Sequence, residues 1–276
     1  MTEGGVMAYD WITDALEETW ASVEAALRDR APADFDAPTA CPGWSVRDVL
    51  SHLLGIEVWL RGGAVPDFEG PMPDHVKNSM GEFNEAFVAA HRGESGAEVL
   101  AQFRAAAAVS IAALRAMSAD EWDVVGWSPE GERPYHRFME TRVLDSWIHL
   151  QDIRDALLEP ADDHGPGEEI VINRFESSLP FVVGKKMSAP DGTLVRVNLT
   201  GRLARSVMVA VANGRAGAVA MANEEPTFEV TTPVALFWRR CAGRISADAF
   251  LGASATDVRG SREMARAFAE ALAIMI

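Results

Sequence analysis

The sequence predicts an α+β protein in which a helical bundle, residues 1–160, precedes a smaller mixed domain, residues 165–276. Apolar side chains recur at helical spacing in the first part, whereas short segments of the second part alternate apolar and polar residues. The charge is divided too: residues 1–160 carry 12 basic and 28 acidic side chains, and residues 161–276 carry 13 of each. Between the two parts, Glu159 to Gly167 holds two prolines and two glycines, which favour a loop and a domain boundary.

The first part contains four long amphipathic segments, as a four-helix bundle requires. The first segment extends from Trp11 to Leu27 and ends before Pro32. The second begins near Ser45, which with Asp48 forms an S-x-x-D helix-start pattern, and ends at a pair of glycines. We expect the other helical segments at about 82–91 (a short one), 97–117 and 136–158.

The second part has the pattern of a sheet with helices. Val195, Val197 and Leu199 alternate with polar residues after a P-D-G turn, which is the period of a half-buried strand. We expect further short strands at 207–211, 216–221 and 227–231, and helices at 237–242 and 262–276.

Composition excludes several classes of protein. The net charge is −16 and the pI about 4.8, so neither nucleic acid nor an anionic membrane is expected as a partner. No stretch approaches ~18 consecutive uncharged apolar residues, and Met1 to Met7 lack the order of a signal peptide. With only Cys41 and Cys241, far apart in sequence, a disulfide framework is excluded and a reducing cytosol is expected.

The candidate chemistry lies in the second and fourth helices. His52 shares a helix face with Val49 and Ile56, where a single histidine is most simply a hydrogen-bonded core residue. The fourth helix carries a polar stripe at spacings of 3, 4 and 3, made of Arg142, Asp145, His149 and Asp152. Either the stripe is a salt-bridged surface, or it faces the bundle interior, where four ionisable groups need partners and a divalent metal would supply one.

A metal site follows from the second alternative. Asp145 and His149, one helical turn apart, can reach one ion, and His52 on the facing helix supplies a third ligand. Two imidazoles and a carboxylate suit Zn²⁺ and leave a fourth position open, as in catalytic zinc sites. Asp152 or Arg142 could then orient His149 or Asp145 from behind.

Three other conspicuous residues have simpler interpretations. Cys41 stands in the turn before the second helix with no neighbouring histidine, and we interpret it as a small packed residue. We interpret Trp44 and Trp147 as core anchors. The remaining histidines lie in polar or loop-like contexts and carry no functional prediction.

Two segments resemble one known family. C-P-G-W-S-V-R-D-V-L-S-H-L-L-G, from Cys41 to Gly55, and R-V-L-D-S-W-I-H-L-Q-D-I-R-D-A, from Arg142 to Ala156, are similar to the two metal-ligand blocks of the mycothiol-dependent maleylpyruvate isomerase family. That family is a branch of the DinB-like four-helix bundles with a sterol-carrier-like α+β domain behind the bundle. The resemblance covers residues 9–160 strongly and residues 165–276 loosely.

The resemblance implies a Zn²⁺ ion held by His52, Asp145 and His149, with the thiol of mycothiol as cofactor at the open position. It implies cis–trans isomerisation of maleylpyruvate or a related S-transfer. Arg142, and Arg244 in the C-A-G-R segment, are then candidate catalytic cations for an anionic substrate. The isomerase has Glu where this chain has Asp145, which weakens the assignment to that one reaction.

Two classes of function therefore remain open. The first is a cytosolic zinc enzyme that uses mycothiol to attack a small electrophile. The second is a non-catalytic protein in which the metal stabilises the bundle and the second domain holds a small apolar ligand. The two differ in whether the fourth metal position is open, as an enzyme needs, or filled by the protein.

Overall fold

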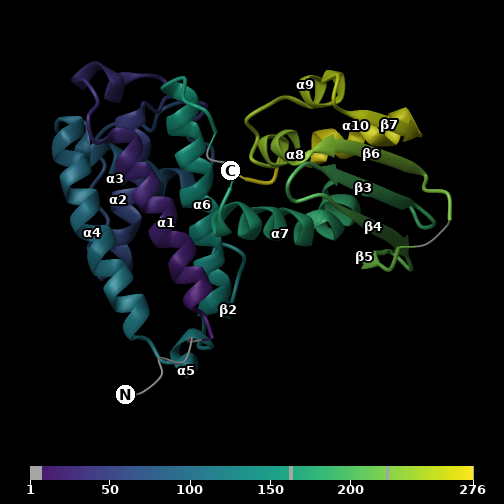
Figure 1. The fold of residues 1–276 in the computed structure, drawn as a ribbon, viewed down its shortest axis with the longest axis horizontal. Coiled ribbons are helices and arrows are strands. Elements are labelled where there is room, and N and C mark those ends of the chain that lie inside the picture. The colour runs from purple at the N-terminus through teal and green to yellow at the C-terminus, as the bar shows by residue number, and fades with distance from the viewer. Residues whose placement is uncertain (1–7, 162–163, 222–223, 276) are drawn as a thin grey trace. The chain divides into compact units, whose positions relative to one another are not determined.

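Four long helices form the framework of the first of two compact units, Met1–Ile170 and Val171–Ile276. These helices are α1 (Asp10–Leu27), α2 (Val46–Leu60), α4 (Gly96–Ala116) and α6 (Tyr135–Ala156). In this computed structural model they lie side by side, and α3 (Ser79–His91) packs on α2 (Figure 1). A 3-10 turn η1 (Pro32–Asp36), a short helix α5 (Ala119–Trp122) and a hairpin of β1 (Val125–Gly126) and β2 (Arg133–Pro134) connect them.

The structure describes residues 8–161, 164–221 and 224–275. The signal-peptide expectation for residues 1–7 and the centre of the predicted loop, residues 162–163, lie outside the described residues. Among the described helices, α4 alone is long and apolar enough to cross a membrane. Core helices of soluble proteins meet the same criterion, and Val99 and Phe103 of α4 belong to the bundle core.

Local chemistry explains where α2 begins. Ser45 is its N-cap: the Ser45 hydroxyl accepts a hydrogen bond from the Asp48 backbone N–H, and the Asp48 carboxylate accepts one from the Ser45 N–H. In the preceding turn, Gly43 has a φ of +78°, a left-handed conformation that favours glycine, and the Trp44 N–H donates to the Cys41 carbonyl at 3.0 Å. The predicted helix start is therefore confirmed, and the turn fixes the backbone of Cys41 and Trp44.

Both the apolar and the polar positions of helix α6 are buried in the bundle. Val143, Ile148 and Ile153 are fully buried, and so is the indole of Trp147, as the core interpretation predicted. Arg142 and Asp152 are also buried, so the polar stripe faces the protein interior. The surface salt-bridge interpretation is therefore excluded.

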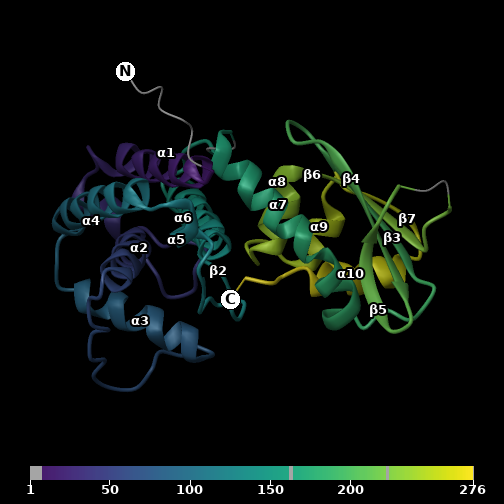
Figure 2. The same ribbon diagram turned by 90° about the horizontal axis from the view of Figure 1, so that it is seen from below.

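The second unit is an α+β fold around a five-stranded sheet with the order β5-β4-β3-β6-β7. Strands β3 and β6 pair in parallel, and the other neighbours pair antiparallel. In Figure 2, α8, α9 and α10 lie on one side of the sheet. The elements are α7 (Pro166–Phe181, which begins in the first unit), the π-helical turn η2 (Val182–Lys186), β3 (Leu194–Thr200), β4 (Arg205–Ala212), β5 (Arg215–Val219), β6 (Phe228–Pro233), α8 (Val234–Cys241), α9 (Ala247–Gly252), β7 (Asp257–Gly260) and α10 (Arg262–Ala271).

The predicted α+β fold class is confirmed, and four predicted strands coincide with β3 to β6. In β3, Val195, Val197 and Leu199 are buried and alternate with more exposed polar residues, as the period-2 pattern predicted. No prediction covered α7, α9 or β7. The two compact units divide within α7, and the predicted domain limits at residues 160 and 165 remain predictions.

Candidate metal centre

The structure brings the three predicted metal ligands together between α2 and α6. The Nε2 atom of His52 lies 3.2 Å from Asp145 Oδ2, and the Nε2 atom of His149 lies 3.5 Å from Asp145 Oδ1. The ligand atoms of all three residues lie within 4.8 Å of one another. Both imidazoles are buried, whereas the Asp145 side chain is 21% exposed. The group is therefore enclosed on the imidazole side and accessible beside the carboxylate.

Arg142 belongs to an ion-pair network behind Asp145. Its guanidinium donates to Asp145 Oδ2 at 2.6 Å and, from Nη2, to Glu57 Oε1 at 3.0 Å. The Glu57 side chain is 1% exposed, so a buried cation lies between two carboxylates. Sequence reasoning missed Glu57. The sequence does contain a sign of its role. Glu57 follows Leu53 by four positions and Leu54 by three, so an acidic residue lies on an apolar face of α2.

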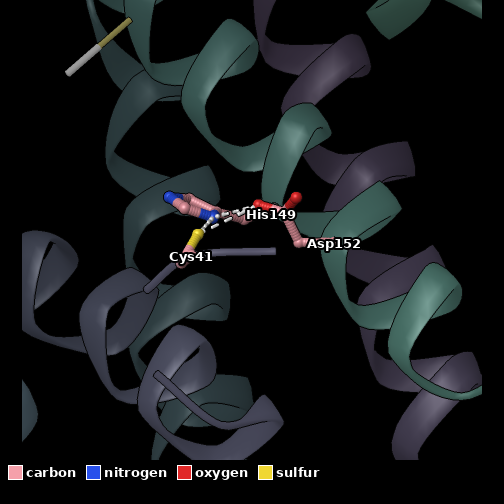
Figure 3. A group of neighbouring side chains, drawn as sticks. All are labelled: Cys41, His149 and Asp152. Carbon is pink, nitrogen blue, oxygen red and sulfur yellow. Dashed lines mark hydrogen bonds and ion pairs between the residues drawn. The ribbon is translucent and has the colours of Figure 1, made fainter. Parts of the chain in front are cut away.

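The prediction that Cys41 has no neighbouring histidine is wrong in the folded chain. Its Sγ atom lies 3.9 Å from His149 Nδ1 and 3.3 Å from Asp152 Oδ2, and the same Asp152 oxygen lies 3.0 Å from His149 Nδ1 (Figure 3). Cys41 and His149 are 108 positions apart in sequence, so only the packing of the turn against α6 brings them together.

Trp44 lies beside the metal-ligand group and is only half-buried. Its ring centroid is 5.3 Å from that of His52 and 6.2 Å from that of His149. The indole N–H donates to Glu85 Oε2 at 2.9 Å, and His75 contacts the same oxygen at 3.0 Å. Trp44 is thus a wall of the site held by a buried acid of α3, a role beyond the predicted core anchor. His75, which carried no functional prediction, belongs to the same network.

The three predicted ligands differ in their charge state in the metal-free protein. Burial opposes ionisation of Asp145, but the neighbouring His52 and Arg142 outweigh it and hold the pKa of this carboxyl well below its usual range. Burial also lowers the pKa of His52. For His149, burial opposes protonation, but the hydrogen bond to Asp152 is among the effects that raise its pKa to about 10. A metal ion bound at Nε2 must therefore displace a proton from His149.

The donor set fits zinc. Two nitrogen ligands and one carboxylate oxygen match catalytic zinc sites that keep one coordination position for water or substrate. Of the three side chains, Asp145 is the one in partial contact with solvent, at 21% exposure. Arg244 lies in the second unit, where its guanidinium donates to the Ala242 carbonyl at 2.8 Å, and its predicted catalytic role remains a prediction.

The chain is thus a helical bundle followed by an α+β unit, and two histidines and a carboxylate on facing helices of the bundle form a candidate metal site. The model of the mycothiol maleylpyruvate isomerase N-terminal domain family matches residues 16–154, half of the chain. The chain therefore belongs to this family. This membership confirms the predicted class of enzyme, an isomerase or transferase whose exact reaction is open.

Two solved structures share the fold. A crystal structure of the mycothiol-dependent maleylpyruvate isomerase superposes with a TM-score of 0.54 at 16% sequence identity, covering 89% of this chain and 93% of that one. A point mutant of the mycothiol-dependent maleylpyruvate isomerase gives a TM-score of 0.55 with the same identity and coverage. No curated protein sequence matches the chain.

Proposed function

We propose that this protein is a zinc-dependent enzyme that activates the thiol of mycothiol for addition to a small electrophile. The reaction is a cis–trans isomerisation of the maleylpyruvate type or an S-transfer, and we expect it to take place in the cytosol. One observation carries the proposal: His52, Asp145 and His149 offer three ligand atoms within 4.8 Å of one another, buried on the imidazole side and accessible beside Asp145.

The chemistry divides between the ion and the chain. When bound, Zn²⁺ stabilises a thiolate, which makes a low-molecular-weight thiol nucleophilic at neutral pH. The two imidazoles and the carboxylate hold the ion, and Trp44 borders the imidazoles. Because Arg142 donates hydrogen bonds to both Glu57 and Asp145, we propose that its role is to hold the Asp145 carboxylate in position. Arg244 remains the proposed cation for an anionic substrate.

Metal analysis tests the zinc site. Protein purified without chelator is expected to contain about one zinc ion per chain, and His52→Ala to lose it, because the other two ligands alone bind weakly. His91→Ala is the matched control and is expected to leave the zinc content unchanged, since His91, the last residue of α3, pairs with Glu94 and is not one of the predicted ligands. Wild-type protein without zinc would overturn the proposal.

Calorimetry tests the thiol. Mycothiol is expected to bind the zinc-loaded protein and not the chelated protein, because the open coordination position is its site. Equal binding after chelation would count against thiol activation by zinc. Consumption of mycothiol in the presence of a panel of electrophiles, with maleylpyruvate among them, then identifies the reaction. A zinc-loaded protein that binds no thiol and consumes none would instead be the metal-stabilised binding protein.

A further inference from the structure

We propose that Cys41 is a positioning residue of the metal centre, acting through Asp152 to orient His149. The inference rests on the proposed function, since it concerns the same zinc site. The Cys41 thiol lies 3.9 Å from His149 Nδ1, on the side of the ring away from the Nε2 atom that lies near Asp145. Figure 3 shows the three side chains converging, with Cys41 in the turn before α2 and the other two on α6.

The hydrogen bonds define the direction in which His149 faces. A neutral imidazole that binds a metal through Nε2 carries its proton on Nδ1. Asp152 Oδ2 lies 3.0 Å from Nδ1 and accepts that proton in a hydrogen bond, which fixes both the tautomer and the ring orientation. Nε2 is then directed toward Asp145, 3.5 Å from its Oδ1 atom.

The thiol in turn holds the carboxylate. Asp152 is 1% exposed, and a buried carboxylate needs several donors. The Cys41 S–H donates to the same oxygen that accepts from His149, at 3.3 Å. The thiol therefore acts as a hydrogen-bond donor to the buried carboxylate.

The turn is rigid enough to place the thiol. The Cys41 carbonyl accepts from the Trp44 N–H at 3.0 Å, and the Cys41 N–H donates to Thr39 Oγ1 at 3.2 Å. Gly43 completes the turn with its positive φ, and a Cβ there would lie 2.4 Å from His75 Nδ1. Backbone contacts on both sides of Cys41 therefore fix its side chain relative to α6.

The other imidazole lacks such support. Nδ1 of His52 is buried and has no hydrogen-bond partner among the residues that the structure describes. Of the two histidine ligands, His149 is therefore the one that a hydrogen bond at Nδ1 orients, through Asp152 and Cys41. Loss of a hydrogen-bonded partner behind a metal ligand costs about 10–100-fold in metal affinity.

Zinc affinity of four variants, measured by competition with a chromophoric chelator, tests the proposal. Asp152→Asn is expected to weaken binding by about 10–100-fold and Cys41→Ala by about tenfold. Cys41→Ser keeps a donor and is expected to remain within about threefold of wild type. Cys241→Ser, at the buried cysteine of the second unit, is the matched control and is expected to leave zinc affinity unchanged.

Three results would overturn the proposal while leaving the proposed function intact. The first is normal zinc affinity of Cys41→Ala, and the second is equal weakening in the Ser and Ala variants. The third is a thiolate-to-cobalt charge-transfer band in Co²⁺-substituted wild type that Cys41→Ser removes, because Cys41 would then be a ligand. Nitrogen-15 NMR of zinc-loaded wild type requires no variant and is expected to show His149 protonated at Nδ1. Wild-type protein that binds no zinc would overturn both proposals.

Discussion

The buried ion pair of Glu57 and Arg142 tests whether burial increases the contribution of an ion pair to the free energy of unfolding. We predict that Glu57→Gln destabilises the metal-free protein strongly. Both side chains are nearly inaccessible, at 1% and 5% exposure, and Glu57 Oε1 accepts from Nη2 at 3.0 Å and from Nε at 3.3 Å. The substitution keeps size and one acceptor oxygen but removes the negative charge.

The expected cost follows from this geometry. Removing one partner of a buried ion pair costs about 3–5 kcal/mol, because the other charge remains in a poorly solvated place. Here Asp145 remains as a second counter-ion to Arg142, and the glutamine oxygen still accepts a hydrogen bond. We therefore expect a loss of about 2–3 kcal/mol in the free energy of unfolding, at or just below the lower end of that range.

The chain contains a matched control on its surface. Arg115 also lies between two carboxylates, Asp14 and Glu17, each at 2.6 Å, but Glu17 is 54% exposed and Arg115 39% exposed. Glu17→Gln makes the same chemical change at a shorter contact and leaves the second carboxylate in place. Because water solvates these charges, we expect a loss of less than about 0.5 kcal/mol.

Urea unfolding of both variants, followed by far-ultraviolet circular dichroism with chelator present, gives the two free energies. The transition of the helical unit is compared at unchanged m-value, so that a shift in midpoint reports stability. Equal losses in the two variants, or a larger loss in Glu17→Gln, would refute the reasoning, since contact distance rather than burial would then govern the energy.

Two further predictions concern packing and protons. Gly55→Ala is expected to lower the free energy of unfolding in urea by about 1–3 kcal/mol, because the new Cβ would lie 2.4 Å from Phe87 atoms. The control is Gly93→Ala, whose Cβ would meet no atom within 4 Å and which is expected to leave stability unchanged. Zinc affinity is expected to rise with pH, by about tenfold per pH unit for one displaced proton, because the metal-free His149 holds its proton up to a pKa of about 10. Calorimetry in buffers of different ionisation enthalpy counts the released proton, and an affinity independent of pH between about 7 and 9 would contradict this prediction.

Features that depend on neighbours in sequence could be predicted from the sequence. The start of α2 is set by Ser45 and Asp48, three residues apart, and Asp145 and His149 share a face because one helical turn separates them. The alternation in β3 likewise reports a single strand. Each of these patterns is complete within one element, so no knowledge of the tertiary fold was needed.

Features that depend on contacts between distant segments could not be predicted in this way. The pairing of Arg142 with Glu57 and the placement of Cys41 against His149 both require the packing of separate elements. Helix α7 was missed for a different reason. Its sequence combines Ile170, Val171 and Ile172 with Pro180 near the end, and β-branched residues and proline lower helix propensity. Burial of Val171 and Phe175 compensates in the folded chain.

In the proposed zinc site, the two sides would act on the ion in opposite directions. The hydrogen bond from Arg142 to Asp145 would make that carboxylate a weaker ligand and leave more positive charge on a bound ion. The hydrogen bond that Asp152 accepts from Nδ1 would make His149 a stronger ligand. Thiol activation benefits from a positive ion, and retention of the ion benefits from strong ligands. In the proposed enzyme, the charged pair Glu57–Arg142 behind Asp145 would therefore favour activation of the thiol, and the neutral donor Cys41 behind Asp152 would favour retention of the ion.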